Sequence, residues 1–255
     1  MNLYEAMNLR KSTRRYCWEP LSEDTLKRIG AFYEEVESLF PGIRTEIGIT
    51  DNLDRKHMPK GLFAVKAPYY LTVYSERKDR YAVNAGYICE QMSLYMHTLG
   101  LGSCFLGSAK LPKKKRVHDD LTFVIMMAFG KPEGILSRRS ADAKRLPLQK
   151  LCTYRDEPGR MIRELLEAAR LAPSAFNTQP WRFVAADGNI HIFSKKNDID
   201  QFRMLDEFSF GTMFSHIMIA ADELWLDVDL IRLENISQKD FKKSQYVLSA
   251  VVREE

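Results

Sequence analysis

The feature that most constrains the fold is a pattern that occurs twice along the chain. Residues 88–99 and 213–224 each place apolar side chains at i, i+4, i+7 and i+11, as one face of a buried helix does. Ile88 and Met213, which begin these two stripes, lie 125 residues apart, and so do Gly86 and Gly211. Amphipathic helices also recur by chance, but an offset shared by several elements favours an internal duplication.

Strand-like runs flank both stripes at a similar offset. The runs are Tyr69–Tyr74 and Leu121–Phe129 around the first stripe, and Ile190–Phe193 and Tyr246–Val252 around the second. Each half therefore reads as helix, strand, long buried helix, strand, which predicts an α+β fold, an α/β/α sandwich. We expect two halves, 1–149 and 150–255, related by a pseudo-two-fold axis as the protomers of a homodimer are, and together forming one compact domain.

Two segments lack the periodicity of regular structure. The segment Gly42–Gly61 is polar and is predicted to be a loop or flap, and Lys131–Pro147 is predicted to be a basic linker between the halves. By contrast, Met161–Leu171 is a good helix former that Pro173 ends.

Composition sets limits on the class of protein. A chain of 255 residues with 45% hydrophobic and 28% charged residues buries a sizeable core without disulfides or a structural metal. The four cysteines are scattered, no signal sequence opens the chain, and no run approaches the roughly 20 apolar residues of a membrane span. We therefore expect a cytoplasmic protein that needs neither metal nor membrane. A net charge of +4 is weak evidence for a nucleic-acid partner.

The segment Arg10–Tyr16 holds four cations and two hydroxyls. Arginine guanidinium groups and a serine hydroxyl suit a phosphate monoester, because they donate charge-assisted hydrogen bonds to its oxygens. A solvated basic patch before a helix is the plainer interpretation of this segment taken alone.

Two turn-like segments could contact a ligand. Ala172–Trp181 carries Ser, Asn and Gln between prolines and aromatics, and this density of polar groups favours a site for a planar heterocycle over a simple helix-to-strand corner. Leu99–Gly107 follows a helix and has Phe105 where the third glycine of a dinucleotide fingerprint belongs, so it is not a Rossmann loop. Its glycines allow a ligand to approach the backbone, although a helix C-cap that runs into a turn is the favoured interpretation of this segment taken alone.

The remaining motifs are weaker. The run Lys110–Arg116 lacks interleaved aromatics, so a solvated surface is favoured over nucleic-acid binding. The histidines show no metal-ligand spacing, and no nucleophile elbow is present.

Taken together, four of these segments resemble the nitroreductase family of FMN-dependent oxidoreductases. R-x-S-x-R is matched by Arg10, Ser12 and Arg14, and A-P-S-x-x-N-x-Q-P-W by Ala172–Trp181. A glycine-containing loop is matched by Gly100–Gly107, and a late basic-x-Pro element by Arg145-Leu146-Pro147. The order of these elements differs from that of ordinary members and is similar to that of the single-chain subgroup, in which two protomers are fused.

The resemblance implies one FMN per chain, held by both halves. The first half would supply Arg10, Lys11, Ser12, Arg14, Leu106, Gly107 and Arg145, and the second Pro173, Ser174, Ala175 and Asn177. Arg10, Ser12 and Arg145 would hold the phosphate and ribityl chain, and Arg14 would lie near the N1/O2 edge. The N–H of Leu106 or Gly107 would bond N5. The mirror-related site is expected to be lost, because Asp227 and Asp229 replace the second glycine loop.

The resemblance further implies NAD(P)H as a transient reductant and a nitroaromatic, quinone or similar small molecule as electron acceptor in a ping-pong cycle. Flavin N5 would carry the chemistry, so no side chain is assigned a catalytic role. A fused pseudo-dimer is expected to work as a monomer, although further association stays open. Two alternatives remain: a flavin-binding protein without turnover and, less favoured, a nucleic-acid-associated protein using Lys113–Arg116.

Overall fold

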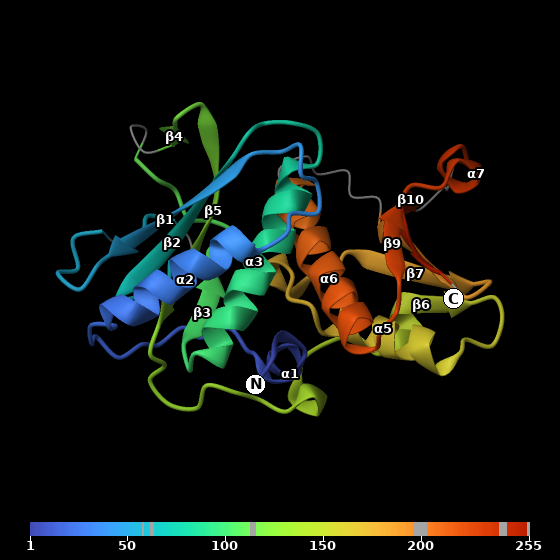
Figure 1. Ribbon diagram of the computed structural model, residues 1–255, viewed down its shortest axis with the longest axis horizontal. Helices are drawn as coiled ribbons and strands as arrows, with labels where there is room; N and C mark the ends of the chain where they lie inside the picture. The colour runs from blue at the N-terminus through green and yellow to red at the C-terminus, as the bar shows by residue number, and fades with distance from the viewer. Residues whose placement is uncertain (58, 62–63, 113–115, 196–202, 240–243, 254–255) are drawn as a thin grey trace. The chain divides into compact units, whose positions relative to one another are not determined.

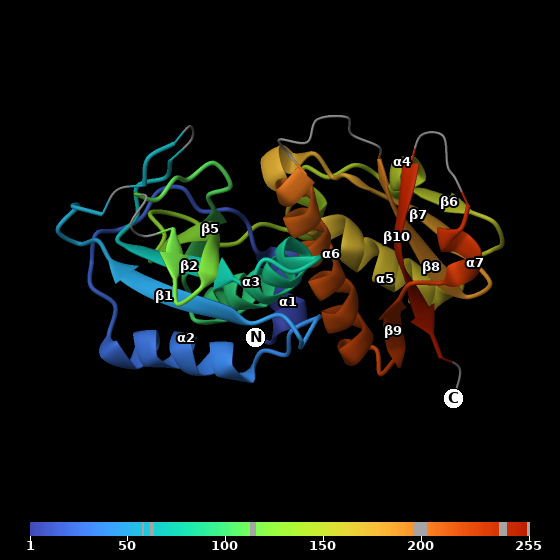
Figure 2. The ribbon, with the colours of Figure 1, turned by 90° about the horizontal axis from the view of Figure 1, so that it is seen from above.

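The computed structural model describes residues 1–57, 59–61, 64–112, 116–195, 203–239 and 244–253 (Figures 1 and 2). The chain forms two compact units, Met1–Asp142 and Ala143–Glu255, each with its own sheet and helices. Within the described part of the chain, no helix combines the length and apolar character needed to cross a membrane.

The first unit is built on an antiparallel sheet in the order β1-β2-β5-β3, with the short β4 paired to β5. Its strands are β1 (Thr45–Asp51), β2 (Tyr69–Ser75), β3 (Gly102–Phe105), β4 (Val117–His118) and β5 (Leu121–Gly130). Its helices are α1 (Leu3–Leu9), α2 (Glu23–Glu35), α3 (Tyr81–Thr98) and the short 3-10 turn η2 (Ser140–Asp142). The long helix α3 packs on β2 and β3, and α2 packs on α3.

Local sequence explains where these elements begin and how they pack. Asn2 and Glu5 form a reciprocal capping box on α1, and the Ser22 side chain caps α2 by accepting a hydrogen bond from the Thr25 N–H. Phe32 of α2 stacks on Tyr95 of α3 with ring centroids 4.0 Å apart. The central strands β2 and β5 are almost continuously buried, which matches their unbroken apolar sequences.

The second unit contains a sheet in the order β6-β7-β8-β10-β9. Its strands are β6 (Cys152–Tyr154), β7 (Trp181–Ala186), β8 (Asn189–Lys195), β9 (Val228–Ile231) and β10 (Ser244–Val252). Its helices are α4 (Leu148–Leu151), α5 (Arg160–Leu171), η3 (Ala175–Asn177), α6 (Arg203–Glu223) and α7 (Glu234–Ser237). Among the described strands of this unit only the β6–β7 pair is parallel, and the long helix α6 packs on α5.

The two sheets share one topology. In the order β1-β2-β5-β3, the long helix α3 joins β2 to β3, and in the order β7-β8-β10-β9 the long helix α6 joins β8 to β9. The helix ends agree with the spacing seen in the sequence, because α3 ends at Thr98 and α6 at Glu223, 125 residues later. The α+β class is confirmed, and each unit contains the predicted order of helix, strand, long helix and strand.

The structure corrects two local predictions. The segment predicted to be a loop, Gly42–Gly61, contains β1, whose register runs from Thr45 opposite Ser75 to Asp51 opposite Tyr69. The glycine segment Leu99–Gly107 is a turn only in part, because Gly102–Phe105 forms β3 and pairs with β5. Both strands lie at the ends of the strand order, where β1 pairs only with β2, and β3 pairs with β5 and otherwise only through the bridge from Ser103 to Ser12. Their sequences therefore lack the apolar runs of central strands.

Candidate functional site

In the first unit, the cationic segment after α1 lies between two backbone partners. On one side Ser12 pairs with Ser103 of β3, and the Thr13 N–H donates to the Ser103 carbonyl over 2.9 Å. On the other side Arg10 pairs with Ser137, and the Cys17 N–H donates to the Lys131 carbonyl over 3.0 Å. The first part of the predicted linker is therefore a structural partner of this segment. Such pairing fixes the direction of each side chain.

Arg10 is a buried cation without a carboxylate partner. Its side chain is 5% exposed, its Nε donates to the Ser93 hydroxyl over 2.8 Å, and its guanidinium lies 5.4 Å from the centre of the Phe105 ring. Its Nη2 is buried without a hydrogen-bond acceptor, and no carboxylate of the described residues lies within ion-pair distance. Burying an unpaired charge is costly, so this donor fits an anion supplied from outside the chain.

The other polar residues of the segment differ in how accessible they are to a ligand. Ser12 and Lys11 are half-buried, and Arg14 is exposed. Arg15 forms an ion pair with Glu133 over 2.9 Å. Arg14 forms no hydrogen bond or ion pair with another described residue, so its guanidinium is available to a ligand.

Gly102 allows this segment to lie against β3. A Cβ atom at position 102 would come 2.3 Å from Thr13 Oγ1 and 2.6 Å from Thr13 Cβ, far inside contact distance. Any larger residue would push the cationic segment away from the strand. The glycine that the sequence placed in a ligand-binding loop thus acts here by allowing the Thr13 side chain to pack against β3.

The turn after β3 presents one backbone donor. The Leu106 N–H donates to the Met126 carbonyl over 2.8 Å, and the Leu106 side chain is buried. Gly107 is exposed, and its N–H meets no acceptor among residues the structure describes. Of the two predicted donors, Leu106 is therefore already engaged, and Gly107 is the one available.

In the second unit, the predicted turn after α5 has an unusual backbone. Phe176, Asn177 and Gln179 have φ values of 51°, 59° and 49°, the left-handed region that non-glycine residues rarely adopt. Two side chains of α6 hold the turn: the Ser209 hydroxyl accepts from the Ala175 N–H over 3.0 Å, and the Thr212 hydroxyl donates to the Pro173 carbonyl over 2.6 Å. Strain retained in this way is typical of functional turns.

Arg145 belongs to this turn, which corrects its placement in the first half. Its Nη1 donates to Asn177 Oδ1 over 2.8 Å and its Nε to the Leu171 carbonyl over 3.2 Å. Asn177 Nδ2 donates in turn to the Lys144 carbonyl over 2.9 Å. Both ends of the Asn177 amide are thus used within the unit. The run 143–147 has no periodicity, so its sequence does not indicate which half holds it.

Burial controls the titration of the groups around Arg10. Desolvation, and next the charge of Arg10, lower the pKa of His97 to about 4. Burial also raises the pKa of the Cys104 thiol, although Arg14 and Arg10 oppose this shift. His97 is therefore neutral and Cys104 protonated near neutral pH, so neither is poised for acid–base or nucleophilic work there.

Several residues of these two clusters were not indicated by the sequence. Ser93, Ser103, Ser209 and Thr212 are single hydroxyls on apolar elements, and only their place in three dimensions gives them a role. Glu46, His118 and Asp119 also gather, with ligand atoms within 4.8 Å of one another, but they are at least partly exposed and no metal role is assigned to them. Lys113–Lys115 of the predicted basic run lie outside the described residues.

The fold is of nitroreductase type, because solved structures described as nitroreductases share it. One is a crystal structure described as that of a putative nitroreductase from Thermotoga maritima. The alignment covers 99% of this chain and 94% of the Thermotoga chain, with 21% identity and a TM-score of 0.65. A nitroreductase family protein from Clostridium difficile covers 62% of this chain and 100% of its own, with 19% identity and a TM-score of 0.50. At these identities the likeness establishes the fold alone.

Family membership follows from the sequence itself. Residues 2–221 match the family model described as "Putative TM nitroreductase", and the chain belongs to that family, whose description indicates an oxidoreductase. No curated protein matches the chain.

Proposed function

We propose that the chain is an FMN-dependent NAD(P)H oxidoreductase that binds one FMN and reduces nitroaromatic, quinone or similar acceptors in a ping-pong cycle. The observation that carries this proposal is Arg10, a buried guanidinium with an unpartnered Nη2 and no carboxylate nearby among the described residues. A phosphate monoester supplies both the negative charge and the acceptor oxygens that this group lacks. Family membership supports the redox chemistry, which the flavin would provide when bound.

We propose that each unit supplies a different set of contacts to the cofactor. In the first, Arg10, Lys11 and Ser12 would hold the phosphate and ribityl chain, Arg14 would stabilise negative charge on the ring, and the Gly107 N–H would bond N5. In the second, Pro173, Ser174 and Ala175 would cover the ring edge. Arg145 donates to Asn177 Oδ1, so we propose that this pair positions the turn beside the cofactor.

The first experiment counts flavin. The purified chain is denatured, and the released flavin is identified by chromatography and quantified from its visible absorption per mole of chain. About one FMN per chain supports the proposed site. Two per chain would mean that the second unit holds a second competent site, and no flavin after reconstitution with FMN would overturn the proposal.

A second measurement separates an enzyme from a flavin-binding protein without turnover. The holoprotein is mixed anaerobically with NADH or NADPH, and the bleaching of flavin absorption is followed, then its return on addition of a quinone. Reduction and reoxidation at rates that support turnover are expected. A holoprotein that neither nucleotide reduces would favour the binding protein.

A further inference from the structure

Beside the Gly107 turn, the first unit contains a small basic pocket. Its volume is about 310 Å³, at the lower end of the range for small-molecule sites. We call it the basic pocket, and its lining consists of Arg77, Ala109, Lys110, Leu111, Arg116, Thr122 and Phe123. Three of these residues are cations, and three others provide an apolar surface that includes an aromatic ring.

The three cations of the basic pocket have no acidic partner among the residues that the structure describes. Arg77 lies over the Tyr81 ring at 5.9 Å, and Arg116 Nε donates to the Leu111 carbonyl over 2.9 Å. Lys110 uses only its backbone N–H, which donates to the Lys60 carbonyl over 2.8 Å. Three like charges around one cavity repel each other, and an anion in the cavity relieves that repulsion.

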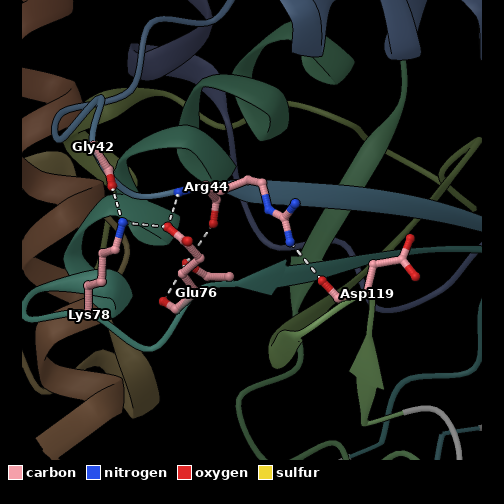
Figure 3. Close-up of polar contacts among 6 residues, drawn as sticks. Gly42, Arg44, Glu76, Lys78 and Asp119 are labelled. Carbon is pink, nitrogen blue, oxygen red and sulfur yellow. Dashed lines mark hydrogen bonds and ion pairs between the residues drawn. The ribbon is translucent and has the colours of Figure 1, made fainter.

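The nearest carboxylate in the sequence is already engaged elsewhere. Glu76, next to Arg77, accepts hydrogen bonds from the Arg44 N–H and from Lys78, each over 2.9 Å (Figure 3). These two bonds hold the pKa of the Glu76 carboxyl below its usual range. Glu76 is therefore committed to Arg44 and Lys78 and does not neutralise Arg77.

The same network fixes the backbone that carries two of the cations. The Arg44 guanidinium donates to the Asp119 carbonyl over 2.7 Å, which ties the start of β1 to the β4–β5 turn (Figure 3). The Glu76 N–H donates to the Arg44 carbonyl over 3.0 Å, which ties the end of β2 to the same residue. Arg77 follows that bond directly, and Arg116 immediately precedes β4. A fixed backbone lowers the entropic cost of binding an anion, because only the side chains remain to be ordered.

The basic pocket is continuous with the turn that carries the proposed N5 donor. The Ala109 N–H donates to the Leu106 carbonyl over 3.0 Å, which closes a tight turn around Gly107. Leu106 and Ala109 belong to one buried apolar cluster, and Leu111 and Phe123 pack against it. A ligand on Phe123 would therefore lie beside the turn whose N–H we assign to the flavin.

We propose that the basic pocket selects the electron acceptor, and that this acceptor is a small aromatic anion, a nitroaromatic or quinone bearing a carboxylate or sulfonate. The inference rests on the proposed function and specifies its substrate class. The volume suits one substituted ring, the apolar side accepts the ring face, and the three cations accept the anionic group.

The test compares a charged and a neutral acceptor of the same shape, para-nitrobenzoate and para-nitrobenzyl alcohol. The triple variant Arg77→Gln, Lys110→Gln, Arg116→Gln removes the three cations of the pocket. A matched control, Arg28→Gln, Lys150→Gln, Arg232→Gln, removes the same number and kind of charges from exposed positions whose side chains form no hydrogen bond or ion pair with another described residue. We expect the pocket variant to raise the KM for para-nitrobenzoate about tenfold or more while that for the alcohol changes less than twofold.

Two further readouts separate the failure of this inference from the failure of the proposed function. Binding of para-nitrobenzoate is measured without reductant by ligand-observed NMR, and FMN per chain is counted for every variant. If the wild-type chain holds no flavin but binds para-nitrobenzoate, and the pocket variant alone loses that binding, the proposed function is overturned and the inference about the pocket is supported. If the enzyme is loaded with flavin, and the pocket and control variants change the KM of both acceptors equally, the inference about the pocket is overturned and the proposed function is not.

Discussion

After the long helix, the two units follow the same path with different chemistry. In the first unit the chain passes through Gly100 and Gly102 into β3, and Gly102 accepts the close approach of Thr13. In the second unit it passes through Trp225, which is 93% exposed, into β9, where Arg253 pairs with Asp227 and Asp229. One strand supports a cationic segment, whereas the other carries acids neutralised within its own unit. A shared topology thus leaves only the first of these segments suited to a phosphate.

The turns between the earlier helix and the sheet differ in the opposite sense. In the second unit the turn before β7 contains three left-handed non-glycine residues braced by α6. In the first unit residues 36–44, which precede β1, contain none, and the Phe40 N–H simply donates to Asn84 over 2.8 Å. The first unit therefore has the cationic segment in specialised form and the second has the strained turn, and neither unit has both.

The largest effect is expected at Gly102. Gly102→Ala places a Cβ atom 2.3 Å from Thr13 Oγ1, so the cationic segment must move, and we expect a loss of about 1–3 kcal/mol in unfolding free energy together with the loss of bound FMN. The matched control is Gly48→Ala in β1, where the new Cβ meets nothing within 4 Å. Urea unfolding and flavin content are measured for both. Full flavin content in Gly102→Ala would show that the contact with β3 does not position the site.

The next effect is expected at Arg14, which is exposed and unpaired among the described side chains. Arg14→Gln removes a charged donor that forms no hydrogen bond or ion pair with another described side chain, and we expect the Kd for FMN to rise roughly 10- to 150-fold. Arg28→Gln removes the same charge from α2 and should leave the Kd unchanged. Titration of the apoprotein with FMN, followed by quenching of flavin fluorescence, gives both constants. Equal values would remove Arg14 from the site.

The same contrast shows what the sequence could and could not reveal. The buried central strands and both long helices were predictable, because their apolar patterns are set by burial on two sides. The strand β1 was missed because its residues TEIGITD are only half-buried and include Gly48, a pattern no stronger than that of a loop. The motif residues Arg10 and Asn177 could be identified from the sequence. Their partners Ser93 and Lys144 were not, since a hydroxyl and a carbonyl acquire a role only through the fold.

A smaller effect is expected from His97 on α3, which lies near the Arg10 charge. Its pKa of about 4 in the folded chain is below the value of about 6.5 in an unfolded one, so the unfolded state binds the extra proton first. The stabilisation is present above about pH 6.5 and is lost as the pH falls toward 4. Between pH 7 and 5 we expect roughly 1–2 kcal/mol of this loss in the wild type but not in His97→Asn.

Urea unfolding of both proteins at the two pH values measures this difference. The gap in stability between wild type and His97→Asn should narrow at pH 5. A gap of the same size at both pH values would mean that the folded and unfolded chains bind the His97 proton equally, so that burial and the Arg10 charge do not lower its pKa.

The smallest effect separates the two helix-to-strand turns. Phe176 is exposed with φ at 51°, a conformation that costs roughly 1–2 kcal/mol for a residue other than glycine. Phe176→Gly relieves this strain but gains about 0.4–1 kcal/mol of freedom in the unfolded chain, so we expect it to be more stable than Phe176→Ala by a few tenths of a kcal/mol. At Phe40, outside the left-handed region, the order should reverse, with Phe40→Gly less stable than Phe40→Ala. Thermal unfolding of the four variants gives both differences. If Phe176→Gly gains stability yet binds FMN more weakly, the strained backbone serves the ligand, because the fold alone would be better off without it.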